Sequence, residues 1–391
     1  MHILLMPQAG SLGLGGLTRC KAVAREAALR GHEVSFFCHP GVADRFRELS
    51  NSIHSAPVPP IRGYGAAPNF RVSDSIIIRG MDDVNYLRAT VSTELALYRA
   101  LKPDVIFTEN QFSSAISSSI ASIPLVTTAA SVNLASFSSP LYADRESVPG
   151  VEHNFNIVRR ENGLPDILSI TDLYHGGSAI NVAPTLREIE PQLAQLPNLI
   201  YVGPLLDSSI EIGPLPDVLK DIQTLKAIYV YMSVGTLTPE EYVPIICVAS
   251  DIGNLSFVVA LRQDNYRGSP LPQTIGRVRL FQTLPGLTTI KKCALVITRG
   301  GQNTLMGCIL SQRPVLGFPG TSAEADFNLR SVENFCEIVR HPTSDFLSHH
   351  LVTLVTQTMA AGIGPAYADL GGRLRSGGGA AAVLTAIEKR L

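Results

Sequence analysis

Short apolar runs alternate with helical patterns through the first half of the chain. An apolar run at residues 2–6 is followed by a glycine-rich stretch, a helical pattern at 17–29 and a second apolar run at 33–38. A strand, a glycine loop, a helix and a strand in this order predict a βαβ unit. The alternation continues with a helix at 87–100, a strand at 105–108, a helix at 112–121 and a strand at 124–128. The first half is therefore predicted to be a parallel α/β domain.

The second half of the chain repeats this rhythm. A buried strand is predicted at 227–232, and Pro239 with the two acids after it marks the start of a helix. The elements predicted after it are strands at 256–261, 278–281, 294–297 and 314–318, and helices at 287–292, 303–310, 325–334 and 379–391. A second parallel α/β domain follows from this order.

Two stretches lack a regular pattern. Residues 206–222 contain few helix or strand signals and are predicted to link the two domains. Residues 131–177 show no steady alternation, so we expect an irregular insertion that helps to shape a ligand site.

Composition narrows the class of protein. Apolar residues make up 45% of the chain and charged residues 17%, which excludes disorder and fits sheets that are covered on both faces. With 32 basic and 33 acidic residues the formal net charge is -1, so the bulk charge does not favour a nucleic-acid partner. The six cysteines form no C-x-x-C pair, and the opening residues lack the basic region of a signal peptide. We therefore expect a cytoplasmic protein without integral membrane association.

Two turns rich in glycine or hydroxyl groups are weak signals of a ligand site. The first contains Gly10, Gly15 and Gly16, which would let the backbone approach a ligand at a helix start. A dinucleotide-binding loop is an alternative, but residues 36–39 supply no acid to bind a ribose. The second turn is Ser233-Val234-Gly235-Thr236, which is either a pyrophosphate contact or a plain tight turn.

A third turn gives the strongest signal. A buried strand breaks into an arginine and two glycines, and a helix with polar residues in its first turn follows. The residues are Arg299, Gly300, Gly301, Gln302, Asn303 and Thr304. Backbone amides, a positive helix end and a planar cation together predict an anion site suited to a diphosphate. A purely structural turn is the alternative.

These motifs resemble those of the UDP-glycosyltransferase family, with the bacterial antibiotic and macrolide glycosyltransferases nearest in length. The matching segments are residues 201–205, Ser233 to Thr236, the block from Leu284 through Arg299-Gly300-Gly301 to Pro314, Phe318-Pro319 and Asn328, and in the first half residues 31–34 with the opening βαβ unit. The resemblance implies the GT-B fold, in which two Rossmann-like domains face each other across a cleft and a C-terminal helix crosses back. It implies an acceptor-binding domain at 1–205, a linker at 206–222, a donor-binding domain at 223–372 and a crossover helix at 373–391.

The donor side departs from the family pattern at several positions. Arg299 stands in place of a diphosphate-binding histidine, a change that keeps a strong anion donor. Gly307 stands in place of a glutamate that holds ribose hydroxyls, and Glu324-Ala325 in place of an Asp-Gln pair that holds the sugar. The chain has no tryptophan to stack on the base. Two alternatives stay open: other residues hold the nucleoside, or the donor is not an ordinary nucleotide sugar.

The catalytic base also departs from the family pattern. Gly16 occupies the position that best matches the family's base histidine, so another group has to take the proton of the acceptor. Glu109, next to the predicted strand at 105–108, is our candidate base. A solvated loop acid or a helix cap is the alternative interpretation of Glu109, and His39 and His153 are further candidates for the base.

The sequence therefore predicts an inverting, metal-independent glycosyltransferase that acts on a small natural-product acceptor. Its co-substrate would be a UDP- or dTDP-linked sugar, with no cofactor and no metal, and the chain could form a homodimer. The alternatives are a GT-B transferase or hydrolase with an unusual donor, such as a sugar diphosphate, and a non-catalytic helper protein of the same fold. Gly16 and Gly307 are the residues that keep these alternatives open.

Overall fold

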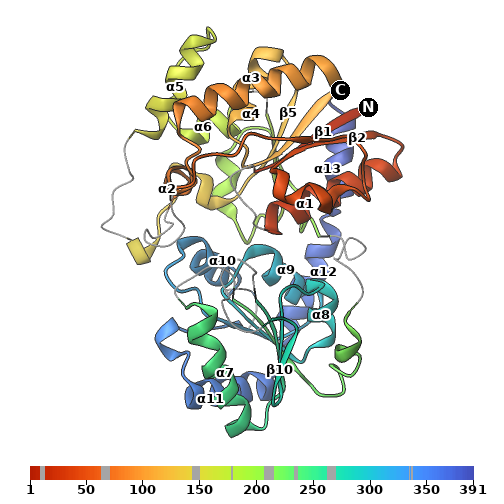
Figure 1. Cartoon of the computed structure of the whole chain (residues 1–391), viewed down its shortest axis with the longest axis vertical. Helices are drawn as coiled ribbons and strands as arrows, with labels where there is room; N and C mark the ends of the chain where they lie inside the picture. The colour runs from red at the N-terminus through yellow and green to blue at the C-terminus, as the bar shows by residue number, and fades with distance from the viewer. Residues whose placement is uncertain are drawn as a thin grey trace. The chain divides into compact units, whose positions relative to one another are not determined.

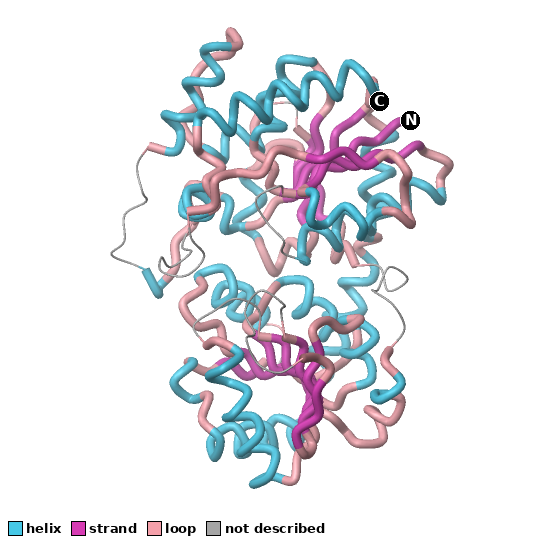
Figure 2. Tube along the Cα trace, viewed as in Figure 1, coloured by secondary structure: helices cyan, strands magenta, loops and turns pink. Residues whose placement is uncertain are grey.

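Each half of the chain builds one sheet with helices on both sides, as the computed structural model shows (Figure 1). The structure describes residues 1–8, 14–62, 71–142, 150–177, 179–206, 215–232, 237–261, 270–333, 335 and 338–391. The first compact unit comprises Met1–Asp207 and Gly377–Leu391, and the second comprises Ser208–Ser376. In Figure 2 the strands lie at the centre of each unit and the helices surround them. The prediction of two α/β domains is confirmed.

The first sheet is parallel throughout. Its strands are β1 (His2–Pro7), β2 (Glu33–Cys38), β3 (Ile53–Ser55), β4 (Val105–Glu109), β5 (Leu125–Thr128), β6 (Ile180–Ala183) and β7 (Leu199–Tyr201), in the order β3-β2-β1-β4-β5-β6-β7. Side chains of alternate residues in β1 pack into different hydrophobic cores. Ile3 and Leu5 belong to one core, and Leu4 and Met6 belong to the other. Period-two alternation of fully buried side chains is the mark of a central strand covered on both faces.

Helices cover the two faces of this sheet unequally. They are α1 (Leu14–Leu29), α2 (Val72–Ile78), α3 (Val84–Leu101), α4 (Ser113–Ala121), α5 (Val151–Glu161), α6 (Ile170–His175) and α13 (Gly379–Glu388). The core that holds Ile3 and Leu5 also receives side chains from α1 and α13, whereas the core that holds Leu4 and Met6 receives them from α2, α3, α4, α5 and α6.

The C-terminal helix is fixed to the first unit by polar contacts as well as by packing. Arg30, just after α1, donates to the Ala381 carbonyl at 2.9 Å and to the Glu388 carboxylate at 2.8 Å, and His32 contacts the same carboxylate at 2.9 Å. Figure 1 shows α13 beside α1. The expected return of the last helix to the first domain is confirmed.

The second sheet repeats the parallel pattern with one antiparallel edge. Its strands are β8 (Ile228–Tyr231), β9 (Phe257–Ala260), β10 (Gln273–Ile275), β11 (Val278–Phe281), β12 (Leu295–Thr298), β13 (Val315–Gly317) and β14 (Val339–Arg340), in the order β10-β11-β9-β8-β12-β13-β14. Only the β10–β11 pair among these strands is antiparallel. The helices are α7 (Pro239–Gly253), α8 (Gly286–Lys292), α9 (Gln302–Leu310), α10 (Ala323–Glu333), α11 (Ser348–Ala361) and α12 (Pro365–Ser376).

Residues 131–177 differ from the irregular insertion that the sequence predicted. They contain α5 and α6, and α5 buries Val151, Phe155 and Val158 against the first unit. Helical spacing of three and four residues separates these apolar positions, but charged and amide residues fill the positions between them and hide the pattern. The predicted linker at 206–222 lies partly outside the described residues, and the predicted crossover segment at 373–391 contains the end of α12 and all of α13.

Each sheet has one place where the strand order reverses direction along the chain. In the first sheet β1 lies between β2 and β4, and in the second β8 lies between β9 and β12. Loops after adjacent strands run to opposite sides there, and ligands of open α/β sheets bind at the carboxyl ends of such strands. The β1/β4 pair and the β8/β12 pair are therefore the places to look for chemistry.

Candidate functional site

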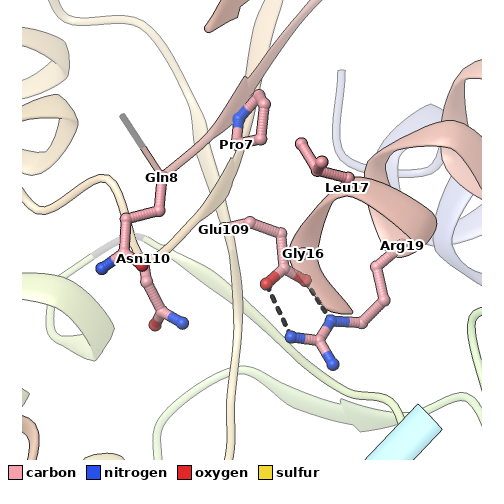
Figure 3. A pocket seen from close by; sticks show the side chains of 7 residues that line it. All are labelled: Pro7, Gln8, Gly16, Leu17, Arg19, Glu109 and Asn110. Atoms are coloured by element: carbon pink, nitrogen blue, oxygen red, sulfur yellow. Dashed lines mark hydrogen bonds and ion pairs between the residues drawn. The ribbon is translucent and has the colours of Figure 1, made fainter. Parts of the chain in front are cut away.

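A small cavity opens at the carboxyl ends of β1 and β4 (Figure 3). Its volume is about 40 Å³, room for a few waters or for the hydroxyl group of a ligand. The lining residues come from the two strand ends and from the first turns of α1: Pro7, Gln8, Gly16, Leu17, Arg19, Glu109 and Asn110. The cavity thus lies where the strand order of the first sheet reverses.

The charged pair in this cavity is Arg19 with Glu109. The guanidinium Nε lies 2.5 Å from Glu109 Oε1 and its Nη2 lies 2.9 Å from Oε2, which makes the contact bidentate (Figure 3). The side chain of Glu109 is 1% exposed and that of Arg19 is 14% exposed. Bidentate charge-assisted hydrogen bonds are among the strongest in proteins, and a buried carboxylate needs such a partner. The pair therefore neutralises Glu109 and fixes it in one orientation.

Glu109 is more tightly held than the sequence suggested. It is the last residue of β4 and pairs in register with Pro7, so it is neither a solvated loop acid nor a helix cap. The charge of Glu109 also affects its neighbours. Burial, and to a smaller extent the negative charge of Glu109, raises the pKa of the Cys20 thiol well above its usual value. Burial and then the same charge also raise the pKa of Tyr174. Both groups therefore stay protonated beside the carboxylate.

The structure places Gly15 and Gly16 in the first turn of α1 and not in a loop, which corrects the prediction for these residues. A helix tolerates glycine best in its first turn, where backbone amides have no partner within the helix. A Cβ atom at Gly16 would lie 3.4 Å from both Cβ and Oε2 of Glu109. Gly16 therefore lets α1 pass close to the carboxylate without a side chain between them. The predicted Gly10 lies outside the described residues.

Two amide side chains complete the polar wall. Gln8 accepts a hydrogen bond from Arg79 at 2.5 Å, and the Asn110 side-chain oxygen accepts one from Asn133 at 3.2 Å. The Tyr174 hydroxyl accepts from the Asn110 backbone at 2.5 Å and donates to the Thr108 carbonyl at 3.0 Å. The hydrogen bonds of Asn133 and Tyr174 fix the residues at the end of β4.

The two histidines that were further candidates for the base, His39 and His153, do not line this cavity. His39 caps a short helical turn by accepting from the Gly41 amide at 2.9 Å, and burial lowers its pKa. His153 is exposed on α5. Neither is among the described residues that line the cavity. The buried His175 is held by Thr127 and Asn181, and burial lowers its pKa to about 4, so its ring stays neutral.

The second unit has a different arrangement at its own strand-order reversal. Ser233, Gly235 and Thr236, predicted to follow β8, lie outside the described residues. Arg299 directly follows β12, and its Nη2 donates to the Pro319 carbonyl at 3.3 Å. The cation therefore sits at the carboxyl end of β12, as the sequence predicted, and a backbone oxygen restrains its guanidinium.

Gly300 and Gly301 play unequal roles after Arg299. Gly300 has a φ of +99°, and a Cβ atom there would lie 2.7 Å from the Ala325 carbonyl oxygen and from Leu329 Cγ. The Asn328 amide donates to the Gly300 carbonyl at 3.0 Å, which fixes this backbone. A Cβ atom on Gly301, the N-cap of α9, would meet nothing within 4 Å. Only glycine fits at 300, whereas space is left open beside 301.

The helix that starts here presents its first turn to that open space. Gln302, Asn303 and Thr304 form the first turn of α9, each is partly buried, and no acid is among them. The backbone amides at the start of a helix and the positive end of the helix dipole attract anions. The exposed Glu324 lies in the first turn of α10, next to Ala325, whose carbonyl abuts Gly300. The structure thus brings the helix starts of α9 and α10 together around Gly300.

Gly307 lies inside α9 and faces α8. A Cβ atom there would lie 2.6 Å from Leu287 Cδ2 and 3.4 Å from Ile290 Cδ1. The position that would carry a ribose-binding acid in the resembling family is therefore closed by apolar side chains of α8.

Arg19, Gln8 and Asn110 were not predicted as site residues. Arg19 lies one helical turn after Gly16 and so shares a face of α1 with it, a spacing that could have paired it with the acid at the end of β4. Among the residues that the structure describes, no group of three or more His, Cys, Asp or Glu side chains is placed to hold a metal ion. Within the same part of the chain no helix is both long and apolar enough to cross a membrane.

Comparison with known proteins gives no matching protein-family model. An uncharacterized glycosyltransferase of Methanosarcina acetivorans is 23% identical over 337 residues, which are 78% of this chain and 75% of that protein. The crystal structure of CalG4, the calicheamicin glycosyltransferase, has 15% identity and a TM-score of 0.71, and the match covers 99% of this chain and 97% of CalG4.

The spinosyn rhamnosyltransferase SpnG gives similar matches in two complexes. With thymidine diphosphate it has 15% identity and a TM-score of 0.68, covering 99% of this chain and 100% of SpnG. With spinosyn aglycone it has 16% identity and a TM-score of 0.70 at the same coverage. The chain therefore has the two-domain GT-B fold of these antibiotic glycosyltransferases, which confirms the fold that the sequence motifs predicted.

Proposed function

We propose that this protein is a glycosyltransferase that moves a sugar from a nucleoside diphosphate to a hydroxyl group of a small acceptor. One observation carries the proposal: Arg299, Gly300, Gly301 and the start of α9 lie together at the carboxyl end of β12. They do so in a fold shared with SpnG, which has been solved with thymidine diphosphate. We infer a thymidine or uridine diphosphate sugar as the donor and a natural product as the acceptor.

On the donor side, the proposed chemistry is electrostatic. The guanidinium of Arg299 and the backbone amides around Gly301 would bind the diphosphate and stabilise the negative charge that grows on it as the glycosidic bond breaks. Gln302, Asn303 and Thr304 would add hydrogen bonds from the first turn of α9, and Ser233, Gly235 and Thr236 would add them from the turn that the sequence predicts after β8. Glu324 would bind the hydroxyls of the donor sugar. Metal-independent transfer with inversion is part of this proposal.

On the acceptor side, Glu109 is the proposed base. Its carboxylate lines a cavity large enough for one hydroxyl group, and Gly16 places no side chain against it. The attacking oxygen would lose its proton towards Glu109 and displace the diphosphate from the anomeric carbon. Cytoplasmic location and homodimer formation remain predictions.

The donor assignment is tested by binding. Because a ligand that binds only the native state raises its melting temperature, thymidine diphosphate should stabilise the protein. Arg299→Ala should weaken thymidine diphosphate binding about 10- to 100-fold by calorimetry, the range for losing a hydrogen-bonded charge. Arg277→Ala, at an exposed turn of the same unit, is the matched control. Unchanged affinity in Arg299→Ala would contradict the diphosphate assignment.

The closed position at Gly307 favours a second candidate. Because Leu287 fills the space where a ribose-binding acid would lie, the protein could use a sugar diphosphate without a nucleoside. A response of the melting temperature to a sugar diphosphate and to no nucleotide would select this candidate. Binding of thymidine diphosphate without turnover of any sugar donor would instead indicate a non-catalytic helper protein.

A further inference from the structure

One face of α10 packs against the turn that follows β12. Ala325 and Leu329 lie on this face, and a Cβ atom at Gly300 would lie 2.7 Å from the Ala325 carbonyl oxygen and from Leu329 Cγ. A Cβ atom at Gly317, the last residue of β13, would also lie 2.7 Å from Leu329. The two glycines therefore let α10 approach the carboxyl ends of β12 and β13. Asn328 shares the face, because residues three and four apart on a helix are neighbours.

Asn328 uses this position to hold one peptide group of the turn. The residue is 7% exposed, and its side-chain amide donates to the Gly300 carbonyl at 3.0 Å. A backbone carbonyl can only accept, so the NH₂ end of the Asn328 side chain is the end that faces Gly300. The hydrogen bond therefore keeps the Gly300 carbonyl oxygen on the side of α10.

The direction of this carbonyl fixes the direction of the next N–H group. The peptide between Gly300 and Gly301 is trans, and in a planar trans peptide the C=O and N–H bonds point to opposite sides. The Gly301 N–H therefore points away from Asn328. Gly301 is the N-cap of α9, and a Cβ atom on it would meet nothing within 4 Å, so a ligand has room beside this residue.

A peptide between two glycines needs such a restraint. Glycine accepts both signs of φ at little cost, so a peptide flanked by glycines turns over more easily than any other. If the Gly300–Gly301 peptide turned over, the carbonyl oxygen would take the place of the N–H and would repel an anion. A backbone anion site depends on N–H groups that stay aimed at the ligand. The hydrogen bond from Asn328 stabilises the orientation that an anion requires.

We propose that Asn328 is a positioning residue of the donor site, which holds the Gly300 carbonyl towards α10 and thereby aims the Gly301 N–H at the diphosphate. This inference rests on the glycosyltransferase function proposed above. Asn328 touches no reacting atom and acts through the peptide between the two glycines. Its effect should therefore concern the phosphate groups of the donor.

Removing the amide tests this role by affinity. Asn328→Leu keeps the size of the side chain and loses the donor, so its affinity for thymidine diphosphate should fall about tenfold by calorimetry, the lower end for a hydrogen bond to a charged group. Asn156→Leu is the matched control, because the buried Asn156 amide of the first unit donates to the Ile167 carbonyl, also at 3.0 Å. Both variants should lose stability, but only Asn328→Leu should lose affinity. Equal affinities for Asn328→Leu and the wild type, or an equal loss in both variants, would overturn the assignment.

The Gly301 amide gives a readout that a merely structural role of Asn328 would not move. In protein that contains isotopically labelled glycine, the NMR signal of this amide is assigned by its loss in Gly301→Ala. Saturation of the wild type with thymidine diphosphate should shift the amide proton downfield, because a hydrogen bond to a phosphate oxygen deshields it. The shift at saturation should be smaller in Asn328→Leu and unchanged in Asn156→Leu. No shift in the saturated wild type would overturn the inference, even if Asn328→Leu does not fold.

Inorganic pyrophosphate separates this inference from the proposed function, because it carries the diphosphate without a nucleoside. If pyrophosphate shifts the Gly301 amide and no nucleoside diphosphate binds, the nucleotide donor is wrong and the role of Asn328 stands. If thymidine diphosphate binds and leaves the Gly301 amide unchanged, the donor assignment stands and the role of Asn328 is wrong. Failure of pyrophosphate and of both thymidine and uridine diphosphate to bind would overturn both.

Discussion

The two sheets reverse their strand order in the same way, yet the chemistry at the two reversal points differs. At β1/β4 a cation and a carboxylate neutralise each other inside a small cavity. At β8/β12 the described residues present one arginine, two glycines and a helix start whose first turn contains no acid. The first place suits an uncharged polar group and the second suits an anion. We therefore propose that one topology serves two kinds of ligand chemistry, and that the side chains at the strand ends set the difference.

The two sites also differ in the interactions that maintain their geometry. The first depends on a buried ion pair, which is destabilising if only one partner is removed. The second depends on backbone geometry at Gly300, where space and φ both require glycine. Mutations should therefore damage the two places through different physical causes.

The largest effect is expected from breaking the ion pair on one side only. Arg19→Ala leaves the buried Glu109 carboxylate without its partner, which should lower the free energy of unfolding by about 3–5 kcal/mol. Urea denaturation measures this change, and Arg99→Ala serves as an exposed control on α3. Replacing both partners by glutamine should restore most of the loss. A loss below about 1 kcal/mol in Arg19→Ala would mean that the pair behaves like a surface salt bridge.

Gly300→Ala should destabilise the site at the carboxyl end of β12 almost as much as Arg19→Ala destabilises the site at the end of β4. Its Cβ atom would lie 2.7 Å from a carbonyl oxygen and a leucine side chain at a φ of +99°, so strain and overpacking together should cost about 3–4 kcal/mol. Gly301→Ala is the matched control, because a Cβ atom there would meet nothing within 4 Å. Equal melting temperatures for the two variants would show that the backbone at 300 relaxes.

A buried carboxyl without a cation sharpens the comparison with Glu109. Glu94 on α3 is fully buried and accepts hydrogen bonds from the Ser113 and Ser117 hydroxyls at 2.6 Å each. Burial raises the pKa of Glu94 from its ordinary value of 4.5 to about 7, and the hydrogen bonds from Ser113 and Ser117 oppose this shift. Lacking a cation, Glu94 keeps its proton near neutral pH.

The sign of the pH dependence follows from this raised pKa. Between pH 4.5 and 7 the folded state holds the Glu94 proton and the unfolded state does not, so stability falls by about 3 kcal/mol as the pH rises through this window. Above pH 7 the contribution is constant. Glu94→Gln should remove this part of the dependence, which urea denaturation at several pH values measures against the wild type. Parallel curves for the two proteins would contradict the assignment.

Much of the fold could be predicted because its signals are local. The strands β2 and β11 begin and end where the apolar runs predicted, and the strong turn after β12 was placed correctly. The helix α5 was missed because its three core positions are diluted by charged and amide residues. The helix forms because these three side chains are buried against the rest of the unit, and short windows of sequence do not reveal such tertiary contacts.

The site was less predictable for a related reason. The proposed anion-binding turn is continuous in sequence, so Arg299, Gly300 and Gly301 could be predicted together. Glu109 and Arg19 are ninety positions apart, and only the neighbouring positions of β1 and β4 bring them into contact. Gly16 looked like a missing base in the sequence, whereas in the structure it lets the first turn of α1 pass close to Glu109 without a side chain between them.

The smallest effect that we predict concerns the closed position in α9. Gly307→Glu should destabilise the second unit by about 1–3 kcal/mol, because its Cβ atom would lie 2.6 Å from Leu287 Cδ2. Leu287→Ala in the same chain should relieve the clash and leave room for the carboxylate. In the family that this chain resembles, the residue at this position holds the ribose of the donor. If the nucleoside lies beside α9 here too, the double variant should bind uridine diphosphate about fivefold more tightly than Leu287→Ala alone. A fivefold gain corresponds to one added hydrogen bond. Calorimetry with uridine and thymidine diphosphates measures this gain, which should be larger for the ligand that carries two ribose hydroxyls. An equal gain for both nucleotides, or none, would mean that the nucleoside lies away from α9 and would strengthen the case for a donor that has no nucleoside.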